Sequence, residues 1–131
     1  MVRFLILSLT VLLTAQAAPA FAQVKSIDVT GQLSGGNFVS AVCSVGATGQ
    51  ITGTGVLYGT NSSNGYTYKY PFIIKQGSTA SGKLVLTGNF AFVGGYPVTL
   101  SASVPNGPLT FSYVVNGKTY TMTGTGTVTT N

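Results

Sequence analysis

The sequence has very few side chains that could carry out chemistry. Its 131 residues include no histidine, no tryptophan, one cysteine and one acidic residue, Asp28. General acid–base catalysis, metal binding and catalytic triads each need at least two reactive groups brought together. The composition therefore predicts a protein that is not an enzyme and that holds no metal or cofactor.

Charge is also scarce, and it is not clustered. Charged residues make up 5% of the chain, and the net charge is +5. Beyond Arg3, the basic residues are single lysines spread along the sequence: Lys25, Lys69, Lys75, Lys83 and Lys118. A nucleic-acid-binding surface needs a basic stripe or patch, so we expect no nucleic-acid partner. Isolated lysines favour solubility and discourage edge-to-edge pairing of strands.

The first 22 residues have the features of a signal peptide. Arg3 is followed by an apolar stretch over 4–15, and Ala20-Phe21-Ala22 has the small-x-small pattern of a cleavage site. The apolar stretch is shorter than the roughly 20 residues that a membrane-spanning helix needs. We expect residues 1–22 to be removed and residues 23–131 to form one domain, exported to the periplasm or beyond, with no membrane span.

The single cysteine has two interpretations. Cys43 alternates in phase with Val39, Ala41 and Val45, which predicts a small apolar core residue. The alternative is a disulfide to a second molecule, because an exported protein reaches an oxidising compartment. No internal disulfide can form with one cysteine.

The remaining pattern is that of a β protein. No segment after the leader keeps apolar residues at helical spacing, and turn signals rich in glycine, proline and asparagine recur about every ten residues. Seven or eight strands are predicted, near 24–33, 37–46, 48–58, 66–75, 83–93, 97–104, 108–115 and 118–129. This spacing predicts an all-β fold, a small antiparallel β-sandwich or barrel with meander connectivity.

The C-terminal hairpin allows a register to be predicted. Asn116-Gly117 is the favoured pair for a two-residue type I′ turn, which places Tyr113 opposite Tyr120 and Phe111 opposite Met122. One face of the hairpin is then apolar and aromatic, and the other carries threonine and serine.

Two places conflict with a regular series of hairpins. Residues 47–59 include four glycines, which mark a bulge or a close approach of two backbones. Pro108 has no N–H to close a tight turn at Asn106-Gly107, so a looser loop is predicted there.

Tyrosines alternate along one predicted strand. Tyr66, Tyr68 and Tyr70 share a face with Phe72. Such a row can fill a core or cap the mouth of a barrel, or it can stack on a sugar ring or a small planar ligand. Pro71 in the same run favours an edge strand or a bulge, and so partial exposure of the row.

Threonines alternate near the C-terminus and form a candidate hydroxyl array. Its members are Thr119, Thr121, Thr123, Thr125 and Thr127, followed by Thr129. Threonine suits the solvent face of a strand. Binding of a repetitive surface such as a polysaccharide requires matching hydroxyls on adjoining strands, of which the preceding strand supplies only Thr110 and Ser112.

These patterns lead to three expectations for function. The first is an exported, non-enzymatic domain with a structural or surface-interaction role, as a matrix, envelope or adhesive component that self-associates or contacts an extracellular polymer or glycan. The second is a small carbohydrate- or apolar-ligand-binding domain that uses the tyrosine row. The third is a small outer-membrane β-barrel, against which the absence of tryptophan girdles counts.

Overall fold

The computed structural model describes residues 24–60, 63–92 and 94–131. In this part of the chain, eight strands form one closed antiparallel barrel in which each strand pairs with the next and β8 pairs with β1. The elements are β1 Ser26–Leu33, η3 Ser34–Gly36 (a 3-10 turn), β2 Asn37–Val45, β3 Ile51–Thr60, β4 Thr67–Ala80, β5 Lys83–Phe90, β6 Pro97–Ser103, β7 Asn106–Val115 and β8 Lys118–Thr130. The predicted all-β meander is confirmed, in its barrel form. The predicted leader, residues 1–22, lies outside the described residues.

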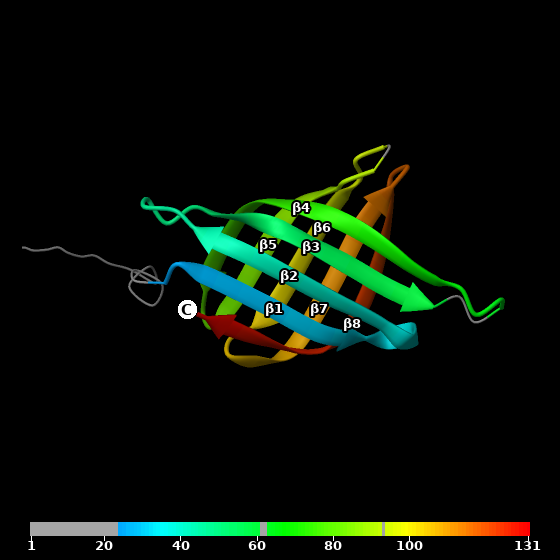
Figure 1. Ribbon diagram of the computed structural model, residues 1–131, viewed down its shortest axis with the longest axis horizontal. Helices are drawn as coiled ribbons and strands as arrows, with labels where there is room; N and C mark the ends of the chain where they lie inside the picture. Colours follow the sequence, from blue (N-terminus) through cyan, green and yellow to red (C-terminus); the bar gives the residue numbers. More distant parts are fainter. Residues whose placement is uncertain (1–23, 61–62, 93) are drawn as a thin grey trace, which may run out of the picture.

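The strands on opposite sides of the barrel cross at a steep angle. Figure 1 shows β1, β2 and β3 on one side, crossing steeply over β5, β6 and β7 on the other, with β4 and β8 turning between them. Strand closure leaves no unpaired edge among the described strands. An open edge is the usual template for adding strands from another molecule, so any self-association would have to use side chains.

The register predicted for the C-terminal hairpin is confirmed. Tyr113 pairs with Tyr120, and Phe111 pairs with Met122. The two central residues of the turn, Asn116-Gly117, both have positive φ, at 50° and 79°. A type I′ turn requires this conformation at both positions.

The prediction of a loop around Asn106-Gly107 is wrong, because the chain reverses before these residues. Both residues belong to β7, and they pair with Thr127 and Gly126 of β8. The chain reverses earlier, at the cis Val104-Pro105 bond. Pro108 therefore lies within a strand, where it faces solvent.

The fourth strand is longer than predicted. β4 continues through Gly77 to Ala80, and the turn that follows contains only Ser81 and Gly82. A bulge at Lys75 shifts the pairing with β5 between Ile74 and Gln76. The extra residue lets the strand bend and continue, so the glycine at position 77 does not end it.

Apolar side chains from all eight strands fill the interior. The largest of the fully buried ones are Phe72, Phe111, Ile27, Ile74, Leu84, Leu86, Leu100 and Leu109. Side chains alternate inward and outward along each strand, so the outer surface receives the serines, threonines and lysines. The apolar core and the polar exterior therefore both result from the alternation of side-chain direction along each strand.

Glycines allow neighbouring strands to approach closely at three bends. A Cβ atom added at Gly53, Gly88 or Gly124 would collide with a carbonyl oxygen of the adjacent strand. The close backbone approach predicted within 47–59 is therefore confirmed at Gly53, where β3 lies against Val42 of β2.

Candidate functional site

One end of the barrel gathers aromatic rings. In a meander barrel, alternate connections lie at the same end, so the β1–β2, β3–β4, β5–β6 and β7–β8 connections share this end. The first and last strands begin and finish at the opposite end. We call the end that carries these four connections the aromatic end. It is defined by the rings of Tyr68, Tyr70, Phe90, Phe92, Tyr113 and Tyr120.

The rings of the aromatic end form stacked pairs. Centroid distances are 4.6 Å for Tyr68 and Tyr70, 4.8 Å for Phe90 and Phe92, and 5.2 Å for Tyr113 and Tyr120. Edge and tilted contacts join the pairs, such as that between Phe90 and Tyr113 at 5.4 Å. Offset and edge contacts are the favoured arrangements of aromatic pairs, so the cluster is a continuous aromatic surface.

Exposure of the rings increases from the core outward. Phe72 and Phe111 lie beneath the cluster and are 1% and 0% exposed. Tyr70, Phe92 and Tyr120 are 42%, 40% and 39% exposed. Large aromatic rings that remain this exposed next to one another form an apolar patch of the kind that marks binding sites.

Asn37 is a buried polar residue beside this cluster. Its side-chain oxygen accepts a hydrogen bond from the Tyr68 hydroxyl at 2.6 Å. Its amide nitrogen donates to the Ser34 carbonyl at 2.8 Å and contacts the Met122 sulfur at 3.1 Å. These contacts tie β2 to β4, β8 and the η3 turn, and they leave the amide committed to the fold.

Two tyrosines of the aromatic end, Tyr68 and Tyr113, have raised pKa values. Burial raises the pKa of Tyr68 above its usual value, and the neighbouring Tyr70 adds to this effect. The pKa of Tyr113 is also raised, mainly by burial and then by the tyrosines around it. Tyr68 and Tyr113 therefore present uncharged rings and hydroxyl groups.

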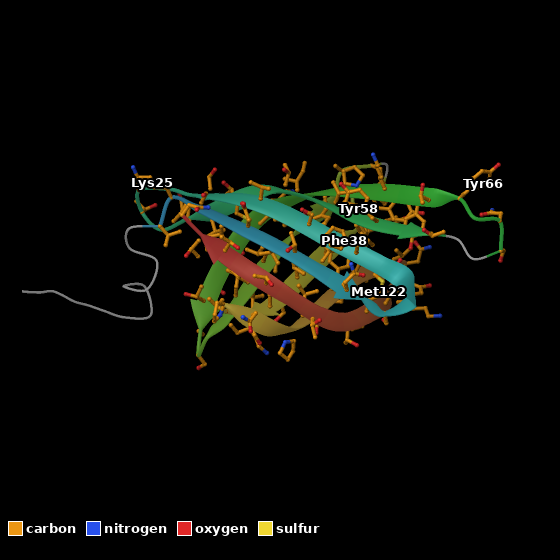
Figure 2. The ribbon with its side chains drawn as sticks, turned by 60° about the horizontal axis from the view of Figure 1, so that its bottom comes forward. Lys25, Phe38, Tyr58, Tyr66 and Met122 are labelled. Atoms are coloured by element: carbon orange, nitrogen blue, oxygen red, sulfur yellow. The ribbon has the colours of Figure 1, made fainter. Side chains whose placement is uncertain are left out.

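The predicted tyrosine row is divided by the structure. Tyr68 and Tyr70 project from β4 into the aromatic end, in line with the buried Phe72. Tyr66 precedes β4, is 74% exposed, and makes no contact with another ring among the described residues. Figure 2 shows it at the far tip of the molecule.

Sequence reasoning missed four members of the cluster as site residues. Tyr113 and Tyr120 were already opposite each other in the predicted hairpin register, and this was the signal that could have added them. Phe90 and Phe92 reach the cluster through the β4–β5 pairing, in which Phe72 lies opposite Phe90.

The predicted hydroxyl array lies on the outside of β8. Thr119, Thr121, Thr123, Thr125 and Thr127 are all exposed. The array is wider than expected, because β8 has a second neighbour, β1, which pairs Thr30 with Thr127. Beyond β7, strand β6 adds Thr99 opposite Ser112 and Ser101 opposite Thr110.

Cys43 is buried inside the barrel, opposite Ile27, and is a free thiol. Burial, with a contribution from the charge of Asp28, raises the pKa of Cys43 from its ordinary value of 9.0 to about 11. A thiol is nucleophilic only as its thiolate. The position therefore favours the core interpretation over an intermolecular disulfide.

We expect Cys43 to react with a thiol reagent about a hundredfold more slowly in the native protein than in urea at pH 8, because a pKa two units higher lowers the thiolate fraction. Absorbance of the released 5-thio-2-nitrobenzoate measures the rate. Ser44→Cys in a Cys43→Ala background is the matched control, since residue 44 is exposed and should react rapidly. Equal rates for the two thiols would contradict burial.

The same pKa has a consequence for stability. The folded state favours the neutral thiol, so its contribution to stability is complete below pH 9 and is lost as the pH rises from about 9 to about 11.

The described residues offer little for other kinds of site. Across 24–60, 63–92 and 94–131, no three metal-binding side chains of the His, Cys, Asp or Glu type lie together. No helix in these same segments has the length and apolar character needed to cross a membrane. No protein-family model, curated protein or solved structure matches the chain.

Proposed function

We propose that this protein is a small, exported, non-enzymatic binding barrel whose aromatic end holds an apolar, planar small molecule. The observation that carries the proposal is the cluster of stacked aromatic rings, of which Tyr70, Phe92 and Tyr120 remain about two-fifths exposed. A flat apolar ligand placed on these rings would remove their remaining surface from water, which is the main favourable contribution to such binding.

An apolar ligand suits this end better than a sugar does. A sugar needs several hydrogen-bonding partners that are not already engaged. The amide of Asn37 donates a hydrogen bond to the Ser34 carbonyl and accepts one from the Tyr68 hydroxyl. Both Asn37 and the Tyr68 hydroxyl are therefore already engaged. Of the tyrosine hydroxyls of the aromatic end, those of Tyr70, Tyr113 and Tyr120 make no hydrogen bond within the described residues, so this end offers a few hydroxyls and mainly ring surface.

The neutral dye N-phenyl-1-naphthylamine is a suitable probe, because it carries two flat aromatic groups and fluoresces strongly only in an apolar environment. We expect the wild-type protein to bind it, and Tyr70→Ala or Phe92→Ala to weaken binding about tenfold, because each variant removes a half-exposed ring. Titration of the dye's fluorescence measures the affinity.

Tyr66→Ala is the matched control for this experiment. It removes an exposed tyrosine that makes no ring contact among the described residues, and the dye affinity should not change. A wild-type protein that does not bind the dye, or an equal loss in Tyr66→Ala, would refute the aromatic end as the binding site.

A second candidate is a surface-interaction role in a matrix, envelope or adhesive structure. It is favoured by two rows of hydroxyl side chains that run in register from β6 across β7 to β8, and by the Thr127–Thr30 pair that joins β8 to β1. An extracellular polymer or glycan is the partner that such a neutral surface fits. Self-association is less favoured, because the closed barrel has no free edge among its described strands.

The outer-membrane barrel is the least supported of the three expectations. Membrane barrels place apolar side chains outward against lipid and polar ones inward. Here Phe111, Leu100 and Leu86 face inward, and β8 presents threonines to the outside.

A further inference from the structure

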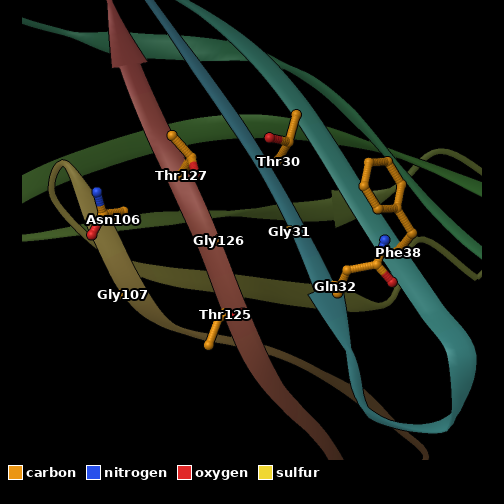
Figure 3. A pocket seen from close by; sticks show the side chains of 9 residues that line it. All are labelled: Thr30, Gly31, Gln32, Phe38, Asn106, Gly107, Thr125, Gly126 and Thr127. Carbon is orange, nitrogen blue, oxygen red and sulfur yellow. The ribbon is translucent and has the colours of Figure 1, made fainter.

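A groove lies on the outer surface of the barrel and shares no residue with the aromatic end. Its volume is about 480 Å³, which is within the range of small-molecule sites. It crosses β2, β1, β8 and β7, and Figure 3 shows its lining. The side chains that line it are those of Thr30, Gln32, Phe38, Asn106, Thr125 and Thr127.

The floor of the groove is backbone. Gly31 pairs with Gly126, and Gly126 pairs with Gly107, so three glycines form a row across β1, β8 and β7. A Cβ atom at Gly31 would lie 2.8 Å from both Leu109 inside the barrel and the Thr125 carbonyl oxygen. The glycines therefore allow β1 and β8 to approach closely above Leu109.

Two ranks of outward side chains form the walls. One runs from Phe38 through Gln32 to Thr125, which are partners in the strand register. The other runs from Thr30 through Thr127 to Asn106. Strands lie about 4.8 Å apart, so a groove across four strands is about 14 Å long. This length suits a short piece of an extended chain molecule.

Apart from Phe38, the side chains that line the groove carry uncharged hydroxyl and amide groups. Hydroxyl and amide groups supply both hydrogen-bond donors and acceptors. Within the described residues, the side chains of Gln32, Thr125 and Asn106 make no hydrogen bond to another part of the protein. No charged side chain lines the groove, so it offers an ionic ligand no counter-charge.

Phe38 adds a ring at one end of the groove. The ring is half-buried and packs against Tyr58 of β3, with 5.9 Å between centroids. Figure 2 shows both residues on the outer surface of the barrel. A ring fixed in this way can cover the apolar face of a sugar, while the hydroxyl and amide groups along the walls bind its hydroxyls.

We propose that this groove binds a neutral glycan chain, with Phe38 stacking on one sugar ring and Gln32, Thr125 and Asn106 hydrogen-bonding to the next. The site is separate from the aromatic end and does not depend on ligand binding there. It makes the second candidate function specific, because it names the partner class and the part of the hydroxyl face that recognises it.

The test uses the purified protein and three neutral hexasaccharides, cellohexaose, maltohexaose and chitohexaose, at millimolar concentration. We expect at least one to shift the backbone amide NMR signals of Thr30, Gln32 and Thr125. Phe38→Ala should weaken that binding about tenfold, because it removes the stacking ring. Thr125→Val should weaken it about fivefold, because it removes one hydroxyl and keeps the shape of the side chain.

Two controls distinguish the groove from the rest of the protein surface. Thr119→Val changes an exposed threonine of the same strand outside the groove and should leave glycan binding unchanged. Phe38→Ala should bind N-phenyl-1-naphthylamine as the wild type does, which also reports that the barrel is folded. Failure of the dye assay alone would remove the aromatic-end function and leave the groove.

Three outcomes would overturn the proposal. They are no shift with any of the three glycans, shifts confined to the aromatic end, and equal loss of binding in Thr119→Val and Thr125→Val. Tighter binding of an acidic polyuronate that weakens with salt would also overturn it, because lysines and not the groove would then carry the interaction.

Discussion

Replacing Phe111 with alanine is expected to lower the free energy of unfolding by about 3–5 kcal/mol. The ring is fully buried, and its centroid lies 5.3 Å from that of Phe72 and 6.2 Å from that of Phe90. The substitution leaves a cavity below the aromatic end that the paired strands cannot close. Since small domains are stable by only about 5–15 kcal/mol, the loss is a large fraction of the total.

Urea denaturation followed by circular dichroism measures this effect. Phe92→Ala is the matched control, because it removes a ring of the same kind that is 40% exposed. Its cost should be clearly smaller, since much of that ring already contacts water. Equal costs for the two variants would show that Phe111 is not packed as described.

Replacing Gly88 with alanine is expected to cost about 3 kcal/mol, although it adds only one methyl group. The new Cβ would meet the carbonyl oxygen of Ile73 on β4. This atom belongs to the backbone, so no change of side-chain rotamer can relieve the contact. The bend where β5 crosses the Lys75 bulge would have to open, and the Ile74–Gly88 pairing would weaken.

Gly46→Ala is the control for this variant. A Cβ atom there would lie 3.6 Å from its nearest neighbour, an atom of Gln50, which is an ordinary contact. The same denaturation experiment should show a change within about 0.5 kcal/mol. If Gly88→Ala were equally mild, the close approach of β4 and β5 would not be required for the fold.

Much of the fold could be predicted because its rules are local. The spacing of turn signals predicted seven or eight strands, of which the barrel has eight, and Asn116-Gly117 set the register of the last hairpin, because the turn and the apolar pattern agree. The length of β4 could not be predicted. Gly77 has the chemistry of a turn residue, but here it lies inside the barrel against Ile51 and Leu86.

The candidate sites were harder to predict, because they depend on how the strands close into a barrel. Tyr68 and Tyr70 were identified from one strand, whereas Phe92 joins them through the β4–β5 pairing and Tyr120 through the contact between Tyr113 and Phe90. The groove was not foreseen. It requires Thr30 of the first strand to lie beside Thr127 of the last, and a sequence pattern does not reveal that pairing.

The meander order has a consequence for how the chain folds. Seven of the eight strand pairings join neighbours in sequence, so short hairpins can form them with a small loss of chain entropy. The eighth joins Ile27 to Thr130, almost the whole chain apart. The pairing of β1 with β8, which we call the seam, therefore carries the largest loss of chain entropy. The outer groove, which straddles the seam, would then be assembled last, after most of the interior has formed.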